Sequence, residues 1–267
     1  MTVRPDETIG DRLPAADTPR VSIIVRCHQQ GRFLAEAVAS ARAQSRPPDE
    51  IVVVDDGSTD TTAAVIDDLL RTGPLVVVRH PVAQGPATSF NAGVAASSGD
   101  LILALDADDA LSPRYVELTE QAILAGADLA YGGVEHFGAQ TSHVEPRPFD
   151  ADELGVESFL HVSSMFRREI FDGTGGFRSD FDGLGLEDWE FWVNAVDHGA
   201  HGRAVGGCWL RYRRHPAGSR NSMRRTTVLR AHLRVHRLHP GTVTWGHLAR
   251  WATRSVRRNL RRAWRPR

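Results

Sequence analysis

Short apolar runs alternate with segments of helical character between residues 21 and 134, and this alternation most constrains the fold. The apolar runs are rich in Val, Ile and Leu and end in polar residues, which is typical of buried strands. Between them, apolar residues recur at spacings of three and four, which indicates amphipathic helices. The alternation predicts an α/β fold with a mostly parallel sheet flanked by helices on both faces. We expect strands near residues 21–26, 50–56, 75–80, 100–106 and 127–134, and helices near 32–44, 60–72, 86–96 and 112–126.

The pattern is weaker after residue 134. Residues 135–157 carry no clear periodicity, so we expect irregular structure there, followed by a Gly-rich segment over 172–199 and a strand near 204–215. The last 50 or so residues have helical spacing, interrupted at 239–241 by His-Pro-Gly. The polar, Pro-containing residues 1–20 predict a flexible leader without the apolar core of a signal peptide.

Charge is divided unevenly along the 267 residues, although the net charge is only −1. Residues 211–267 contain 17 Arg and no acidic residue. The first 210 residues hold the other 15 Arg and all 33 acidic residues, a net charge of −18, and Lys is absent from the whole chain. Two cysteines, Cys27 and Cys208, provide neither a disulfide framework nor metal-site spacing, so we expect a cytoplasmic protein. No apolar run reaches the roughly 18 residues of a membrane-spanning helix.

Two acidic clusters follow predicted strands, at the edge where ligands bind in parallel α/β folds. The segment "VDDGSTD" places Asp55 and Asp56 side by side, and "LDADD" places Asp106, Asp108 and Asp109 within four residues. A receiver domain, a haloacid-dehalogenase-type phosphatase or a P-loop NTPase would need a Lys, which is missing. A dinucleotide-binding domain would need G-x-G-x-x-G where this chain has "RCHQQGR". Clustered carboxylates suit a hard divalent cation, with an N-cap or loop cluster as the alternative.

Taken together, four segments resemble family 2 glycosyltransferases of the GT-A fold. The resemblance is carried, in that family's order and from Val21 to Ser219, by "VSIIVRCHQQGRFLAEAVASARAQSRPPDEIVVVDDGSTD", "GPATSFNAGVAASSGDLILALDADD", "GGFRSDFDGLGLEDWEFW" and "YRRHPAGS". It implies a GT-A, Rossmann-like fold and an inverting transferase that uses a nucleotide-diphosphate sugar and Mn2+ or Mg2+. It also implies a catalytic domain over 21–220, with a nucleotide-binding half (21–134) and an acceptor half (135–220). An Arg-rich helical extension would follow over 221–267.

The same resemblance implies the partners. A UDP-sugar is the favoured donor, and the acceptor is a glycan or a lipid-linked molecule in cell-envelope or surface polysaccharide synthesis. Two alternatives stay open. A nucleotidyltransferase that makes the activated sugar would want a Gly-rich, basic first loop, for which "RCHQQGR" is a poor candidate. A non-catalytic module that binds a sugar nucleotide or a carbohydrate would keep the fold without turnover.

By resemblance, the ends of the first two strands hold the nucleotide base. His28 would lie against the face of the base, and Asp56 would accept a hydrogen bond from its ring N–H. Asp55 would support the loop, since a carboxylate at a turn readily accepts backbone N–H groups. The family commonly ends its first strand in a Pro-x-Tyr-Asn pattern, which this chain replaces with "RCHQ" at residues 26–29.

By resemblance, the "LDADD" and "YRRH" segments hold the rest of the donor. Asp106 would contact the ribose, and Asp108 would bind the metal that bridges the two phosphates, with His215 as a second metal ligand. Arg213 and Arg214 would face the diphosphate, or lie on the surface as solvated charge. Asp109 would either bind substrate or cap the following loop.

The segment "LEDWEFW" reads as the start of a helix, where the helix dipole would lower the pKa of Asp188. By resemblance, Asp188 is the general base that takes the proton of the acceptor hydroxyl. Glu187 would orient the site, and Trp189 would line the acceptor cleft. The alternative for Asp188 is an acid that only begins the helix.

Residues 244–265 have the pattern of an Arg-rich amphipathic helix. Apolar residues recur at spacings of three and four, and Arg covers most of the remaining surface. This pattern is typical of a helix on an anionic membrane surface, which would make the protein peripheral on the inner face of the cell membrane. Packing against the acidic domain or a partner subunit is the alternative. No nucleic-acid motif accompanies the charge, so we expect no nucleic-acid partner.

Overall fold

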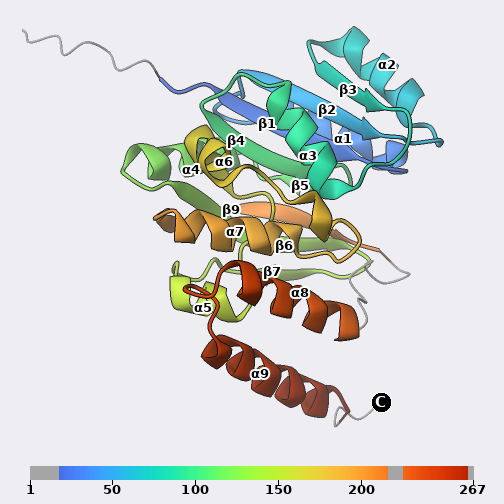
Figure 1. The fold of residues 1–267 in the computed structure, drawn as a ribbon. Coiled ribbons are helices and arrows are strands. Elements are labelled where there is room, and N and C mark those ends of the chain that lie inside the picture. Colours follow the sequence, from blue (N-terminus) through green and yellow to red (C-terminus); the bar gives the residue numbers. More distant parts are fainter. Residues whose placement is uncertain (1–17, 216–224, 264–267) are drawn as a thin grey trace, which may run out of the picture.

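A sheet with helices on both faces forms the body of the protein (Figure 1). The computed structural model describes residues 18–215 and 225–263, so most of the predicted leader and the end of the predicted catalytic domain lie outside the described residues. The strands follow the order β3-β2-β1-β4-β8-β6-β9-β5, with β7 beside β6. They are β1 (Val21–Cys27), β2 (Glu50–Asp56), β3 (Val76–His80), β4 (Leu101–Asp106), β5 (Ala110–Leu111), β6 (Leu129–Gly138), β7 (Ser142–Val144), β8 (Met165–Arg167) and β9 (Gly202–Arg214).

The four strands within residues 21–106 form a parallel half of the sheet, as predicted. β1 lies between β2 and β4 and pairs in parallel with both, and β2 pairs in parallel with β3. Val, Ile and Leu fill these strands because both faces of a parallel sheet are covered. In register, Arg26 of β1 stands beside Val54 of β2 and Asp106 of β4. The carboxyl ends of these three strands therefore meet at one edge.

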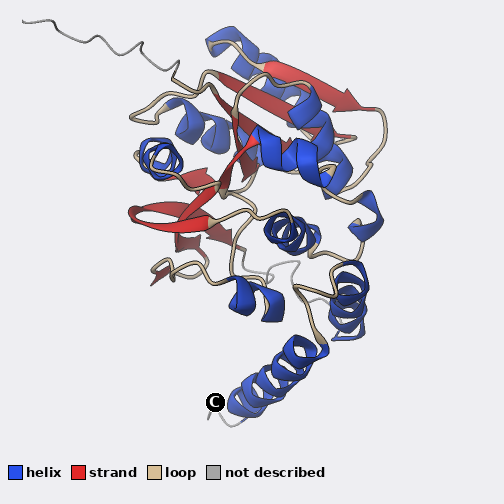
Figure 2. Cartoon of the chain, turned by 60° about the vertical axis from the view of Figure 1, so that its left-hand side comes forward, coloured by secondary structure: helices blue, strands red, loops and turns tan. Residues whose placement is uncertain are grey.

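The helices divide between the two faces of the sheet (Figure 2). One apolar core is shared by the sheet with α1 (Gly31–Arg42), α2 (Thr62–Thr72) and α4 (Tyr115–Leu124). The other is shared with α3 (Pro86–Ala95), α5 (Ala151–Val156), α6 (Arg168–Thr174), the short 3-10 helix Ser179–Phe181, and α7 (Glu187–Asp197). The predicted α/β architecture, with helices on both faces of the sheet, is confirmed.

Beyond β4 the sheet is mixed rather than parallel. β8 pairs antiparallel with β4 and β6, and β5 pairs antiparallel with β9, whereas β6 and β9 run parallel. The prediction of irregular structure over 135–157 is wrong in part, because β6 continues to Gly138 and β7 and α5 follow. The apolar run ends at Val134, but pairing with β9 satisfies the backbone groups beyond it. The strand therefore continues without an apolar signal.

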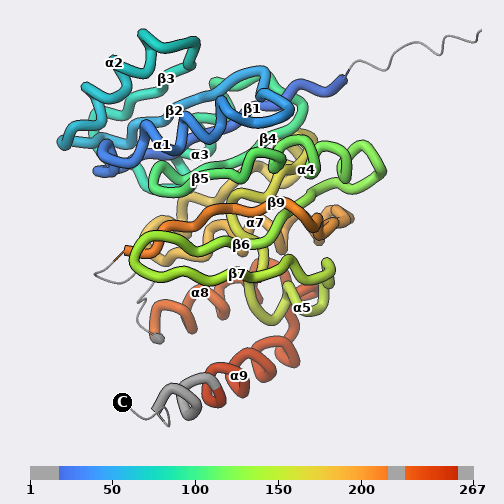
Figure 3. Tube along the Cα trace, turned by 180° about the vertical axis from the view of Figure 1, so that it is seen from behind, coloured from blue at the N-terminus to red at the C-terminus, as the bar shows by residue number. Residues whose placement is uncertain are grey.

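The C-terminal extension is helical where it is described, as α8 (Arg225–Leu238) and α9 (Trp245–Ala263) (Figure 3). Ion pairs join α9 to α5. Arg254 contacts Glu153 at 2.7 Å, Arg250 contacts Asp152 at 2.5 Å, and Nε2 of His247 lies 2.7 Å from the same Asp152 carboxylate. This part of α9 therefore packs on the acidic body of its own chain, which was the alternative to a membrane role. No helix in the described ranges is both long and apolar enough to cross a bilayer.

Candidate active site

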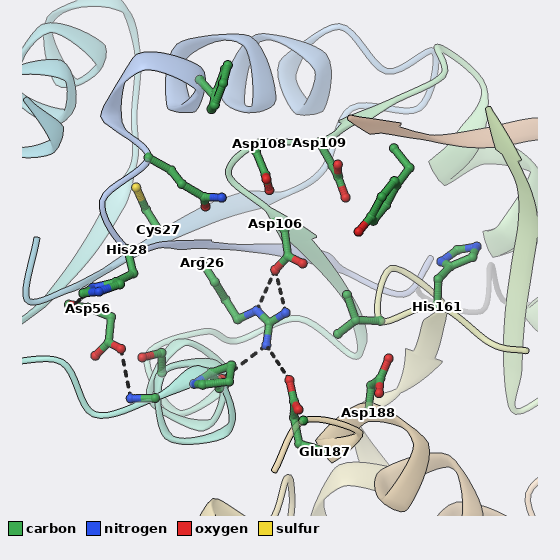
Figure 4. A pocket seen from close by; sticks show the side chains of 18 of the residues that line it. Arg26, Cys27, His28, Asp56, Asp106, Asp108, Asp109, His161, Glu187 and Asp188 are labelled. Carbon is green, nitrogen blue, oxygen red and sulfur yellow. Dashed lines mark hydrogen bonds and ion pairs between the residues drawn. The ribbon is translucent and has the colours of Figure 1, made fainter. Parts of the chain in front are cut away.

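A cleft of about 1290 Å³ lies beyond the carboxyl ends of β1, β2 and β4 (Figure 4). The start of α7 borders it, and alternate residues of β6 and β9 also line it. Trp189 and Arg213 are absent from its lining. The other eight predicted site residues all line this single cleft: His28, Asp56, Asp106, Asp108, Asp109, Glu187, Asp188 and His215.

The two acids of "VDDGSTD" have different partners. Asp55 accepts a hydrogen bond from the backbone N–H of Ser58 at 3.0 Å, the turn-supporting contact that was predicted. Asp56 accepts from the backbone N–H groups of Gln84 at 2.8 Å and Gly85 at 3.0 Å, and lies 2.8 Å from Nδ1 of His80. Burial would raise the pKa of Asp56, but these hydrogen bonds outweigh it and lower the pKa. Asp56 is therefore an ionised carboxylate that ties β2 to the loop before α3.

His28 lies beside Asp56 at the end of the cleft formed by β1 and β2 (Figure 4). Its Nδ1 is 2.6 Å from the carbonyl oxygen of Asp56. Since a carbonyl only accepts, Nδ1 carries the proton and donates. The bond fixes the imidazole ring as one wall of the cleft, a position compatible with the predicted contact to a base.

Asp108 and His215 lie together, with His215 Nε2 at 2.9 Å from Asp108 Oδ2. Carboxylate oxygen and imidazole nitrogen are both metal-ligand atoms, and a divalent cation can replace a hydrogen bond between them. No group of three or more His, Cys, Asp or Glu side chains converges as a cage within the described residues. The pair would thus supply two ligands, and substrate oxygens and water the rest. This donor set fits a divalent cation with mixed oxygen and nitrogen ligands.

Asp109 supports the strand that carries His215. Its Oδ1 accepts from the backbone N–H of Arg213 at 2.9 Å, and the residue is buried. Burial, followed by the charges of Asp106 and Asp108, raises the pKa of Asp109 well above its usual value. The contacts match the loop-supporting alternative that the sequence left open for this residue.

Arg213 does not face the cleft, so the prediction that it faces the diphosphate is wrong. Its guanidinium lies 4.5 Å from the ring centroid of Phe33 and 4.3 Å from that of Phe137, and it pairs with Glu36. Side chains of a strand alternate between two faces. The next residue, Arg214, points to the cleft side and lines it.

Glu187 and Asp188 are the first two residues of α7. They lie across the cleft from the acidic residues that end β4 and follow it (Figure 4). Asp188 Oδ1 accepts from the backbone N–H of Trp189 at 2.7 Å. Burial and then the charge of Glu187 raise the pKa of Asp188 to about 7. The prediction that the helix start lowers this pKa is wrong, because burial and a neighbouring carboxylate outweigh the backbone N–H group.

Trp189 is a core residue, so the prediction that it lines an acceptor cleft is wrong. Its side chain has no exposed surface, and its Nε1–H donates to the carbonyl of Leu154 at 2.7 Å. The ring also packs against His232 of α8, with centroids 4.4 Å apart. One residue along α7 turns the side chain about 100° away from Asp188, which places it against α5 and α8 instead of in the cleft.

Sequence reasoning missed several lining residues, of which Arg26 is the most central. In the sequence, Arg26 stands out only as part of a departure from the family pattern. Nε and NH2 of its guanidinium donate to Asp106 Oδ1 at 3.0 and 2.5 Å. His161 also lines the cleft, and burial lowers its pKa to about 4, so the ring is neutral. A lone His outside any motif gives no sequence signal for a site residue. Arg26 did give one, because it stands where the family pattern has Pro.

The comparisons with known proteins agree with this geometry. The sequence model described as Glycosyl transferase family 2 matches residues 22–184. The succinoglycan biosynthesis protein ExoU of Rhizobium meliloti (strain 1021) is 32% identical over 222 residues, covering 73% of this chain and 62% of ExoU. The crystal structure of S. aureus TarS 1-349 with UDP-GlcNAc has a TM-score of 0.65 at 18% identity, over 82% of this chain and 65% of TarS 1-349. The mannosyltransferase PcManGT from Pyrobaculum calidifontis, with GDP-Man and Mn2+, has a TM-score of 0.56 at 22% identity, over 72% and 57%.

The fold and these likenesses define a glycosyltransferase of the GT-A class, as predicted. The chain belongs to glycosyltransferase family 2, because the family match spans more than half of it. It covers between 35% and 62% of the length of the first four curated relatives that it matches. At 18–22% identity, the structural likenesses show the fold alone.

Proposed function

We propose that this chain is an inverting, metal-dependent glycosyltransferase that moves a sugar from a nucleotide-diphosphate sugar to an acceptor hydroxyl. One juxtaposition carries the proposal. The Asp108–His215 pair, suited to a cation, shares a cleft with Asp188, whose pKa of about 7 suits a general base at neutral pH. A non-catalytic binding module would have no need of such a base.

The transfer is a single displacement. The acceptor oxygen forms a bond to the anomeric carbon while the bond from that carbon to the diphosphate breaks, so the nucleoside diphosphate leaves with the electron pair. Asp188 takes the hydroxyl proton, and attack opposite to the leaving group inverts the configuration. Held by Asp108 and His215, a divalent cation would offset the charge that develops on the leaving diphosphate. Burial, and after it the charge of Glu187, raises the pKa of Asp188 to about 7, so that this carboxylate can take up a proton at neutral pH.

The donor side of the cleft supports a nucleotide sugar. His28 and Asp56 form the wall where we place the base, and Asp106, whose Oδ1 accepts from Arg26, lines the cleft where we place the ribose. Of the similar solved structures, TarS 1-349 is in complex with UDP-GlcNAc and PcManGT with GDP-Man and Mn2+. We propose a UDP-sugar as the donor and a glycan or lipid-linked acceptor in polysaccharide synthesis, in line with the name of ExoU.

Binding and turnover separate this proposal from its alternative. Titration calorimetry with UDP and GDP, with and without Mn2+, should show nucleotide binding that strengthens with metal. Asp188→Asn should retain that binding and lose transfer by about 10²–10⁴-fold. Asp67→Asn, at an exposed carboxylate of α2, is the matched control and should keep full activity. Metal-independent binding without turnover in the wild type would favour the non-catalytic module.

We also propose that α9 places the protein at the inner face of the cytoplasmic membrane. Trp245 and Val256 are 69% and 58% exposed on this helix, and Arg257 is exposed beside them. Co-sedimentation with vesicles tests this: binding to anionic vesicles, reduced by Trp245→Ala, is expected. Equal and weak binding to anionic and neutral vesicles would refute the membrane role.

A further inference from the structure

Arg26 is the cation at the centre of the cleft (Figure 4). Two of its nitrogens donate to one oxygen of Asp106, at 3.0 and 2.5 Å, and NH1 lies 3.9 Å from Glu187. NH1 also donates to the carbonyl of Pro86 at 3.3 Å. The side chain is 10% exposed, so it is held rather than mobile in solvent. It therefore contacts three segments that come from β4, α3 and α7.

The sheet register sets this position. Arg26 and Asp106 are direct neighbours on the parallel strands β1 and β4, so their side chains leave the sheet together on one face. Ile24, two residues earlier, packs in the core shared with α3 and α7, which identifies that face as the one bearing Glu187. A charged guanidinium at the buried end of a strand is costly unless it is paired. Asp106 and Glu187 supply the pairing.

We propose that Arg26 is a positioning residue that joins the donor half of the site, through Asp106, to the acceptor half, through Glu187. The inference rests on the proposed function and deepens it. A buried guanidinium bonded to both sides fixes the spacing between the ribose-binding carboxylate and the helix start that carries Asp188. Without it, Asp106 and Glu187 have no cation between them in the described part of the chain, and their repulsion widens the cleft.

The charge of Arg26 also affects the pKa of Asp188, the proposed general base. The groups that face Asp188 are Glu187 from its own helix, Asp106 from β4 and Arg26 from β1. Asp182 adds a further negative charge near Glu187. Arg26 is the cation among these groups and lowers the pKa of Asp188, so its removal raises that pKa. The acid limb of the activity profile should then move to higher pH.

The test compares Arg26→Met, an unbranched apolar side chain without charge, with Arg26→Lys, which keeps the charge without the guanidinium fork. For Arg26→Met we expect kcat to fall by about 10²-fold, the effect typical of misplaced groups. The apparent pKa of the acid limb in the pH profile of kcat/KM should increase by about one unit. Arg26→Lys should recover the pH profile and part of kcat. Arg79→Met, at an exposed Arg–Asp pair on β3, is the matched control and should change neither quantity.

Several outcomes would overturn the inference without touching the proposed function. An active wild type whose Arg26→Met variant keeps its kcat and its acid limb would show that Arg26 is only a structural charge. The same conclusion would follow if Arg26→Met and a folded Arg26→Lys variant, checked by circular dichroism and nucleotide binding, lost kcat equally and neither variant shifted the acid limb. A wild type with no transfer at all would instead refute the proposed function.

Discussion

Replacing Asp188 by Asn is expected to abolish transfer and also to stabilise the fold above neutral pH. Burial and Glu187 raise the pKa of Asp188 from 3.8 to about 7. At about 1.4 kcal/mol per pKa unit, ionising this carboxyl costs about 4 kcal/mol more in the folded protein than in the unfolded chain. Because the side chain is partly exposed, water screens part of that cost. We therefore expect about 2 kcal/mol of stabilisation from the neutral amide.

The sign follows from linkage between protonation and folding. The pKa of Asp188 is higher in the folded state, so its contribution to stability is fully present below about pH 4 and is lost as the pH rises through 7. Asn stays neutral throughout. Wild type and variant should therefore have similar stability near pH 4 and differ by about 2 kcal/mol near pH 8.5, with the variant more stable.

Urea and thermal denaturation at both pH values measure the effect on stability, and a nucleotide-release assay measures the effect on transfer. The melting temperature of the variant near pH 8.5 should exceed that of the wild type by about 4 °C. Asp67→Asn, at an exposed surface pair, should change neither stability nor transfer. A variant that is no more stable than wild type at pH 8.5, or that keeps transferring sugar, would refute the reasoning about Asp188.

Three further predictions test other parts of the structure. Removing the imidazole with His215→Ala should weaken Mn2+-dependent nucleotide binding by at least about 10-fold in calorimetry, with metal-free binding unchanged; equal loss without metal would contradict a ligand role. His239 lies between two carboxylates of α7, at 2.9 Å from buried Glu190 and 2.5 Å from Asp197, and these bonds outweigh burial and raise its pKa. His239→Ala should cost about 3 kcal/mol of stability at pH 6 by urea denaturation, and less at pH 9, because a raised pKa contributes stability that is lost as the pH rises through it; a loss that grows with pH would argue against the ion pair. Trp189→Phe should lower the melting temperature by a few degrees through its lost bond to Leu154, while the KM for acceptor stays the same; a raised KM would return Trp189 to the cleft.

Local signals were enough for the elements that build the donor half. The strand β2, for example, is a short apolar run, Ile51 to Val54, that ends in two carboxylates at the edge of the sheet. The turn after Asp55 also follows from residue type, because its carboxylate bonds the backbone N–H three residues on. Parallel pairing then brings distant strand ends to one edge, so eight predicted residues meet in one cleft.

Contacts between segments distant in the sequence determined how far β6 extends and which motif side chains face the cleft. β6 runs on past Val134 because β9 pairs with it, although the continuous apolar run has already ended there. Trp189 and Arg213 each stand next to a cleft residue in the chain, yet helix and strand geometry turn both away. Neighbours in sequence share a motif, but only the angle between successive side chains decides which one reaches a ligand.

The sequence alone therefore predicted which strand ends carry the clustered carboxylates, since this depends only on the order of the strands and on short apolar runs. It did not tell how each carboxylate titrates or which cation stands beside it. Asp188 owes its raised pKa to burial and to Glu187, and Asp106 owes its ion pair to Arg26, 80 residues earlier in the chain. Electrostatic energies depend on distance and solvent exposure, and the packed chain alone establishes both.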